Sequence, residues 1–324
     1  MQTIRCAFVD FWASFTPKDI PFLFESYNVI IDSDTPDYLF FSCFGHEHFK
    51  YNSCVKIFWS GENLEPDFNN CDYSISYSEI VYEDRAFRDH CCFNLYKESP
   101  LPRLTEEELL NRKFCNFIYS NNRFADPFRV RLFDELSKYK KVDSAGSLLN
   151  NVGFFIPPTY SDKIKFQSQY KFSLAIENSS MPGYTTEKIF HPFLAHSLPI
   201  YWGNPHIPSD FNPMAFINLH DFSSAVEMVE EIIRLDNDDD AYLVKVMAPF
   251  YPHGNNFEEF LGTEKKRLLQ FYNSIFTQPL SKARRRTMYG RVYISRWEQE
   301  NLHLSRKTLF WGIQQRIRRL ILNN

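Results

Sequence analysis

The chain has 324 residues, of which 44% are hydrophobic and 23% are charged, proportions typical of a folded globular protein rather than a disordered or fibrous one. That length suits two domains of ordinary size, each able to bury its own core. The formal net charge of −4 conceals an asymmetry, because residues 281–324 contain 11 basic and two acidic residues. The remainder of the chain is acidic, which argues against a nucleic-acid binder.

Seven cysteines all lie within the first 115 residues and include no Cys-x-x-Cys pair. An odd number without metal-ligand spacing argues against a disulfide framework or a zinc site. The apolar run near Met1 is also too short for a signal peptide or a membrane-spanning helix. We therefore expect a protein of the reducing cytoplasm.

The first predicted domain covers residues 1–97 and alternates short apolar runs with polar turns, a pattern that predicts a small, mainly parallel α/β layer. The predicted strands are residues 4–8, 29–31, 38–41, 55–59 and 73–77. Loops at the carboxyl ends of parallel strands face a common crevice. Glu62 follows Gly61 directly after one of these strands, which makes it a candidate for the lip of that crevice. Glu47 follows another strand and competes for the same role.

Residues 98–112 contain Pro100, Pro102 and a run of charged residues, which predicts a linker between domains. A surface helix capped by Thr105 is compatible with the same stretch.

The second predicted domain covers residues 113–280 and begins with a strand, residues 113–119, that leads into Ser120 and Asn121. A helix is predicted over residues 127–139, with Arg129 and Arg131 in its first turn. Cations near a helix start are electrostatically unfavourable unless an anion lies there. This position indicates contact with a diphosphate from the first turn, and the family resemblance given below assigns that contact to Arg129 and leaves Arg131 as a surface residue or an indirect partner.

Residues 170–205 predict a strand, a crossover helix that opens at Thr185 or Thr186, and a second strand. The junction between the first strand and the helix carries five polar or aromatic residues: Glu177, Asn178, Tyr184, Glu187 and Lys188. A helix start offers unpaired N–H groups that suit phosphate, and Lys188 adds a full positive charge. Glu187 could accept hydrogen bonds from ribose hydroxyls. The segment therefore has the chemistry to hold a sugar nucleotide.

The rest of the second domain predicts a strand over residues 215–219, a helix from Ser223 and a solvated acidic loop over residues 237–240. The basic segment 281–324 then forms a tail with an imperfect apolar stripe, made of Leu309, Phe310, Ile313, Ile317, Leu320 and Ile321. A basic, aromatic and amphipathic tail favours an anionic membrane surface. Docking of the tail against the protein's own body is the alternative.

Two motifs make the chain recognisable. Residues 172–179 read F-S-L-A-I-E-N-S and residues 184–188 read Y-T-T-E-K, with Gly61-Glu62-Asn63 upstream and Ser120-Asn121 between them. Together they resemble the signature of the α-1,3-fucosyltransferases, glycosyltransferase family 10, and most closely the bacterial Lewis-antigen type. The resemblance extends over roughly residues 55–275 of the chain.

The resemblance implies a GT-B fold, in which two Rossmann-like α/β domains face a central cleft, the N-terminal one binding acceptor and the C-terminal one GDP-fucose. The implied reaction is inverting transfer of L-fucose from GDP-β-L-fucose to the GlcNAc 3-OH of a lactosamine-type glycan, in Lewis-type O-antigen synthesis. Glu62 would be the catalytic base, and Arg129 and Lys188 would stabilise the leaving diphosphate. The implied donor site comprises Ser120, Asn121, Arg129, Asn178, Tyr184, Glu187 and Lys188.

No D-x-D motif suited to a diphosphate-bound metal stands out, so we expect no essential metal and no cofactor. With the basic tail, the resemblance implies a peripheral protein on the cytoplasmic face of the inner membrane. Two alternatives stay open. One is a transferase of the same fold with another GDP-sugar or an α-1,4 linkage. The other is a non-catalytic, membrane-associated protein that binds glycan or nucleotide.

Overall fold

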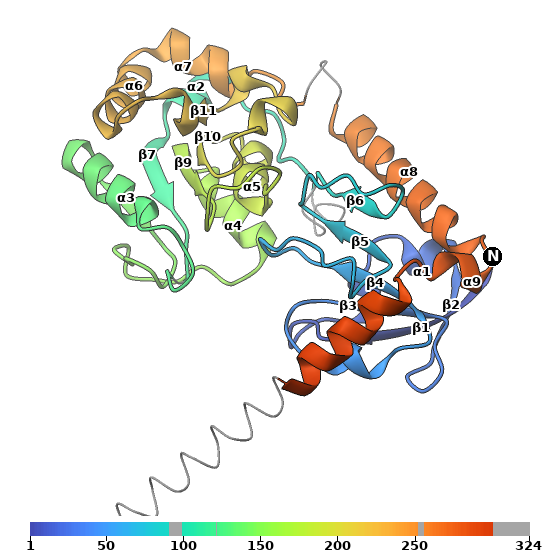
Figure 1. Ribbon diagram of the computed structural model, residues 1–324. Coiled ribbons are helices and arrows are strands. Elements are labelled where there is room, and N and C mark those ends of the chain that lie inside the picture. Colours follow the sequence, from blue (N-terminus) through green and yellow to red (C-terminus); the bar gives the residue numbers. More distant parts are fainter. Residues whose placement is uncertain (91–98, 121, 252–255, 301–324) are drawn as a thin grey trace, which may run out of the picture.

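The computed structural model describes residues 1–90, 99–120, 122–251 and 256–300, and two parallel sheets dominate it (Figure 1). The N-terminal sheet has six strands in the order β2-β1-β3-β4-β5-β6, and every neighbouring pair is parallel. Its strands are β1 (Thr3–Val9), β2 (Asn28–Ile31), β3 (Tyr38–Phe41), β4 (Val55–Trp59), β5 (Tyr73–Ser76) and β6 (Ala86–Arg88). The five predicted strands are confirmed, and β6 is an additional edge strand.

Strands β3, β4 and β5 are buried along their whole length, as parallel strands covered on both faces must be. Only the short helices η1 (Pro17–Asp19), α1 (Leu23–Ser26) and η2 (Glu47–Lys50) connect the first strands. One face is instead covered by a helix from far along the chain, α8 (Phe257–Phe276). Its Leu268, Tyr272, Ile275 and Phe276 pack in the N-terminal core.

The position of α8 corrects the predicted domain boundary. The prediction assigned residues 113–280 to the C-terminal domain, but after residue 256 the chain returns to the N-terminal domain. Ala283 of α9 (Leu280–Ala283) is fully buried in the same core, so the start of the predicted tail is part of the folded body. Residues 288–300 continue as a helix, and the predicted stripe over residues 309–321 lies outside the described residues.

The C-terminal sheet has five strands in the order β11-β10-β9-β7-β8, again with all pairs parallel. The strands are β7 (Lys113–Phe117), β8 (Val142–Ser144), β9 (Tyr170–Ile176), β10 (Leu198–Trp202) and β11 (Ile217–Asn218). The helices are α2 (Glu106–Leu110), α3 (Phe128–Tyr139), α4 (Tyr160–Gln167), α5 (Glu187–Leu194), α6 (Ala225–Asn237) and α7 (Asp239–Val246), with η4 (Ile207–Ser209), η5 (Pro213–Ala215) and η6 (Leu219–Asp221) between them.

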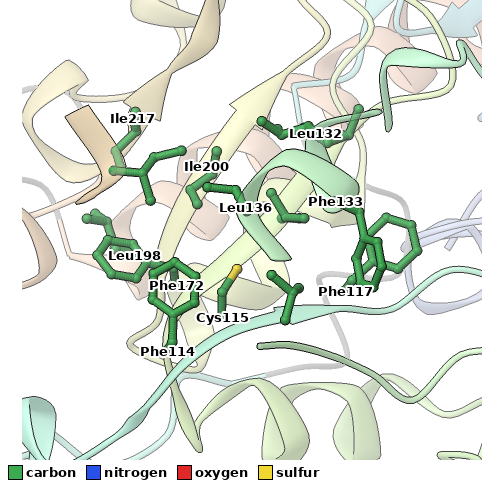
Figure 2. Close-up of a cluster of buried hydrophobic side chains, with 14 of the residues drawn as sticks. Phe114, Cys115, Phe117, Leu132, Phe133, Leu136, Phe172, Leu198, Ile200 and Ile217 are labelled. Carbon is green, nitrogen blue, oxygen red and sulfur yellow. The ribbon is translucent and has the colours of Figure 1, made fainter. Parts of the chain in front are cut away.

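Figure 2 shows the core on one side of this sheet, where Leu132, Phe133 and Leu136 of α3 face side chains of β7, β9, β10 and β11. The helix predicted over residues 127–139 is therefore confirmed as α3, and these three residues lie on its apolar side. α2 also bears out the alternative interpretation of the linker, because Thr105 caps it through a capping box with Glu108.

The predicted acidic loop over residues 237–240 is wrong in part. Asp238 ends α6 and caps α7, its side chain accepting a hydrogen bond from the backbone N–H of Ala241. Acidic residues at a helix start complement the helix dipole, so the run begins a helix instead of forming a loop.

Candidate active site

Helix α5 begins where the sequence places it. Thr186 is its N-cap, and the Thr186 side chain accepts a hydrogen bond from the backbone N–H of Lys188. Glu177, at the carboxyl end of β9, is fully buried and accepts hydrogen bonds from both the backbone N–H and the hydroxyl of Thr186, at 2.8 Å each. Strand end and helix start are thus locked together by one buried carboxylate.

Lys188 lies between two carboxylates. Its Nζ is 3.0 Å from Glu177 Oε2 and 3.5 Å from Glu187 Oε1, and it donates to the Thr186 hydroxyl at 2.8 Å. Burial alone would lower the pKa of Lys188, but the two carboxylates outweigh burial and hold that pKa well above its usual value. The lysine is therefore charged, and it faces the site as a fixed cation.

The pKa values of the two carboxylates are shifted in opposite directions. Burial raises the pKa of Glu177 even though Lys188 acts against it. Glu187 has a side chain 26% exposed. Burial acts to raise its pKa, but Lys188, His191 and Lys163 together outweigh burial and lower the pKa to about 2. Glu187 is therefore a permanent anion at the helix start, suited to accept hydrogen bonds from hydroxyl groups.

Arg129 is only 2% exposed, although it lies in the first turn of α3. Its Nη2 donates to the carbonyl of Ile176 at 3.0 Å and to Asn178 Oδ1 at 2.8 Å, which connects the start of α3 to the carboxyl end of β9. Its guanidinium lies 4.0 Å from the ring centre of Tyr119. By contrast, the side chain of Arg131 is 69% exposed and lies 4.0 Å from Asp126, so its prediction as a surface residue is confirmed.

Tyr119, which the sequence did not single out, lies between the two predicted cations. Burial raises the pKa of its phenol to about 12, while Arg129 and Lys188 both act to lower it. The phenol donates to the carbonyl of Leu174 at 2.8 Å and accepts from the N–H of Ile176 at 2.7 Å. Ser120 follows it at the exposed end of β7, and Asn121 lies outside the described residues.

A cavity of about 30 Å³ is lined by Glu187 and Lys188 and by four polar side chains absent from the prediction: Tyr119, Lys163, Gln167 and His191. Gln167 is 7% exposed, and its Oε1 accepts no hydrogen bond from the described residues. Burial lowers the pKa of His191 to about 4, so it is neutral at pH 7. α4 carries Lys163 and Gln167 at i and i+4, a spacing that places them on one face of the helix.

A second cavity lies between the domains. It is lined by Glu62, Glu65, Tyr77 and Ser78 from the N-terminal domain and by Met181, Pro182 and Tyr184 from the C-terminal domain, with Asn63 and Leu64 completing it. Asn63 donates a hydrogen bond to the Ser179 hydroxyl across the interface. Glu62 therefore faces Tyr184, and Tyr184 is near enough to Lys188 and Glu177 for both to influence its pKa.

Around this cavity the two domains fit closely. Tyr77 and Tyr184 meet edge to face, with ring centres 5.6 Å apart. Gly183 has φ +83°, and a Cβ there would lie 2.3 Å from the carbonyl oxygen of Tyr77. A glycine is required at this position on both counts. Arg88 forms a bidentate pair with Asp210 of the C-terminal domain, at 3.0 and 2.6 Å.

The competing carboxylate, Glu47, lies elsewhere. Its side chain is 60% exposed and pairs with Lys50 on the surface of η2. In the described part of the chain, no three His, Cys, Asp or Glu side chains are grouped so as to hold a metal ion. Within those same residues, no helix combines the length and apolar character needed to span a bilayer.

Two parallel α/β domains that meet over a buried cation, a helix start and an interdomain carboxylate define a glycosyltransferase of the GT-B class. Residues 6–96 match the alpha-(1,3)-fucosyltransferase FucT N-terminal domain, and residues 110–245 match the C-terminal domain of glycosyltransferase family 10. The chain belongs to glycosyltransferase family 10, the fucosyltransferases.

Individual relatives agree. Alpha-(1,3)-fucosyltransferase FucT of Helicobacter pylori is 33% identical over 261 residues, which cover 69% of this chain and 53% of that protein. Alpha-(1,3)-fucosyltransferase B of Drosophila melanogaster is 35% identical over 118 residues, 33% of this chain and 26% of that protein. The chain thus spans about half the length of the first relative, or less of others.

Among solved structures, a crystal structure of an alpha1,3-fucosyltransferase with GDP superposes with a TM-score of 0.66 at 26% identity, covering 83% of this chain and 91% of that one. A crystal structure of an alpha1,3-fucosyltransferase with GDP-fucose gives a TM-score of 0.65 at the same identity and coverage. The GT-B fold expected from the motifs is confirmed.

Proposed function

We propose that this protein is an α-1,3-fucosyltransferase that takes L-fucose from GDP-fucose. The observation that carries the proposal is the interdomain cavity that Glu62 and Tyr184 share, next to the cluster of Lys188, Glu177 and Glu187. Family membership and the solved relatives with GDP and GDP-fucose support the same donor.

In the proposed mechanism the diphosphate of the donor lies at the start of α5. The backbone N–H groups of that helix start and the Lys188 ammonium receive the negative charge that develops as the bond between fucose C1 and the β-phosphate oxygen breaks. Arg129 orients Asn178 and adds positive potential from beneath the strand ends. Glu187 accepts hydrogen bonds from ribose hydroxyls, and Gln167 offers a further buried acceptor in the same cavity.

On the other side of the cavity, the Glu62 carboxylate removes the proton from the acceptor hydroxyl as that oxygen attacks fucose C1. Glu62 is an exposed residue whose backbone N–H is fixed by the Ser60 hydroxyl at 3.1 Å, so the loop is held while the carboxylate reaches into the cleft. Attack from the side opposite the diphosphate inverts the configuration, from β in the donor to α in the product.

The proposed acceptor is the GlcNAc 3-OH of a lactosamine-type glycan, and the proposed setting is Lewis-type O-antigen synthesis at the cytoplasmic face of the inner membrane. Helix 288–300 supports membrane attachment, because Met288, Tyr289 and Trp297 are 76%, 79% and 52% exposed on it. Exposed aromatic residues next to arginines are typical of a helix that lies on an anionic membrane surface.

The test compares Glu62→Gln with Glu47→Gln, the competing carboxylate. Loss of a general base lowers transfer by about 100- to 10,000-fold, so Glu62→Gln should lose that much while its affinity for GDP-fucose stays within about threefold. Glu47→Gln should retain activity. The substrates are a panel of GDP-sugars with type 1 and type 2 lactosamine, and product linkage is determined by NMR.

Full activity in Glu62→Gln contradicts the proposed base. A preference for another GDP-sugar selects the alternative donor, and an α-1,4 product selects the alternative linkage. Binding of GDP-fucose without turnover by the unmodified protein supports the non-catalytic alternative.

A further inference from the structure

A polar cavity of about 290 Å³ lies on the N-terminal domain, away from the proposed active site. It is lined by Asp72, Ser281, Arg284, Arg286 and Arg291. Asp72 directly precedes β5, and the arginines contact the residues that directly precede β4, so the cavity lies at the amino ends of these strands. Glu62 follows the carboxyl end of β4, at the opposite edge of the sheet.

Asp72 cannot neutralise this cavity, because its carboxylate is fully used. One oxygen accepts from the backbone N–H groups of Arg285 and Arg286, both at 2.7 Å. The other accepts from the N–H of Lys56 at 2.8 Å and from Arg286 Nε at 2.9 Å. Three arginines therefore line a cavity that contains a single carboxylate. That carboxylate already accepts hydrogen bonds from one arginine side chain and three backbone N–H groups.

Two of the arginines are held in place. Arg284 Nη1 donates to the carbonyl of Ser53 at 2.9 Å, and Arg286 Nη2 donates to the carbonyl of Cys54 at 2.7 Å. Arg291, one turn into helix 288–300, has no side-chain hydrogen bond or ion pair with any described residue. Arg284 and Arg286 also keep guanidinium N–H groups beyond those used for the carbonyls.

The surrounding potential is positive. Lys56, in β4, is only 2% exposed, and burial together with Arg286 lowers its pKa to about 8. Like charges gathered around an open polar cavity repel one another, and a bound anion relieves that repulsion. Guanidinium groups in a fixed fork match the oxygens of a phosphate group, and the Ser281 hydroxyl adds a neutral donor.

We propose that this cavity, which we call the arginine pocket, binds a phosphate group, either the headgroup phosphate of an anionic lipid or a soluble phosphate ester. The site does not depend on fucose transfer, since its residues are remote from the donor and acceptor groups. Helix 288–300 leads away from it with exposed apolar side chains, so a headgroup held in the pocket would lie beside a surface suited to lipid (Figure 1).

The experiment compares Arg291→Ala with Arg296→Ala in the full chain. Both residues are exposed on the same helix and carry the same charge, but only Arg291 lines the pocket. Binding of inorganic phosphate and of glycerol 3-phosphate is measured by calorimetry, and binding to vesicles of phosphatidylglycerol or of phosphatidylcholine by co-sedimentation. Arg291→Ala should weaken binding by about fivefold or more, as expected for one basic contact, and Arg296→Ala by less than about twofold.

Binding of the soluble phosphates that Arg291→Ala selectively weakens assigns a soluble ligand. Selective weakening with phosphatidylglycerol vesicles alone assigns a lipid headgroup. Equal effects of the two substitutions would overturn the proposal, because a general electrostatic attraction does not distinguish the two arginines. Binding of none of the probes would overturn it as well. Fucose transfer to a soluble acceptor should be unchanged in both variants, which shows that they are folded.

Discussion

The buried pairing of Lys188 with Glu177 gives a quantitative prediction for Lys188→Met, which keeps an unbranched side chain, shorter by one atom, and removes its charge. Glu177 has no exposed surface, and Lys188 Nζ lies 3.0 Å from it. Removing one partner of a buried ion pair costs about 3–5 kcal/mol, because the other charge is left uncompensated. Since whole domains are stable by about 5–15 kcal/mol, this loss is a large fraction of the total.

The double variant Glu177→Gln with Lys188→Met is the matched control. It leaves no buried charge unpaired, and the glutamine Oε1 can still accept from the N–H of Thr186. We expect it to recover at least about 2 kcal/mol of the loss in urea unfolding at pH 7. The penalty of Lys188→Met alone should shrink from pH 8 to pH 5, since Glu177 can then take up a proton.

Both variants should lack fucose transfer, because the proposed role of Lys188 at the diphosphate is lost in each. Stability and activity are thereby separated. If the free energy of unfolding of Lys188→Met lay within about 1 kcal/mol of that of the unmodified protein, the reasoning would be refuted, because breaking a buried ion pair costs several times that amount. A double variant no more stable than the single one would refute it equally.

Three further predictions follow from other contacts. Arg88→Lys loses the bidentate bond to Asp210. It should lower kcat/KM in steady-state assays by about tenfold and the free energy of urea unfolding by about 1.5–3 kcal/mol. Equal activity would show that fucose transfer does not need this contact between the domains. Burial lowers the pKa of His48 to about 4, so as pH falls the imidazole is protonated in the unfolded chain before it is protonated in the folded one, and up to about 3 kcal/mol of stability is lost between pH 6.5 and 4. His48→Gln should flatten that part of a plot of unfolding free energy against pH. An unchanged slope would contradict the lowered pKa of His48. Glu187, with its pKa lowered to about 2, contributes stability above pH 4.5 that is lost as pH falls toward 2. In Glu187→Gln the free energy of urea unfolding should therefore fall less between pH 4.5 and 2. An equal fall in the variant and the unmodified protein would contradict this contribution.

Much of the fold could be predicted because its signals are local. The strands β3 and β10 coincide with continuous apolar runs in the sequence, and β4 coincides with a run that only Lys56 interrupts. The start of α5 was predictable from Thr186 for the same reason, since a threonine before an acidic first turn caps a helix. Such features depend on side chains within a few positions of one another.

Other features could not be predicted because they depend on distant partners. α8 follows the C-terminal domain in sequence, yet its apolar face completes the N-terminal core, and no local pattern says which of two sheets an amphipathic helix covers. The position of Arg286 also depends on a distant partner. As part of a basic run it was assigned to a membrane-binding tail, whereas it is buried by its ion pair with Asp72, 214 residues away in sequence.

For the candidate site, the sequence indicated which residues carry charge, but it did not indicate how that charge is used. Arg129 was predicted to touch diphosphate from the first turn of α3, and the structure instead shows it bound to Asn178 and Ile176 beneath the strand ends. Its contact with a donor phosphate stays a prediction. Tyr119, Gln167 and Lys163 were not predicted because each is an ordinary residue in its own segment, and only the packing of α4 on α5 and β9 brings them to Glu187.

Asn204 connects the interdomain contact to the loop that precedes α5. Its Nδ2 donates to Asp210, the partner of Arg88, at 3.2 Å and to the Thr185 hydroxyl at 3.1 Å, while its Oδ1 accepts from the N–H of Gly183 at 2.9 Å. The side chain is fully buried, so these bonds cannot be exchanged for water without opening the interface. The loop before α5 is therefore shaped by the same contact that holds the domains together. Movement of the N-terminal domain away from Asp210 would disturb Thr185 and Gly183, and with them the position of Tyr184 opposite Glu62.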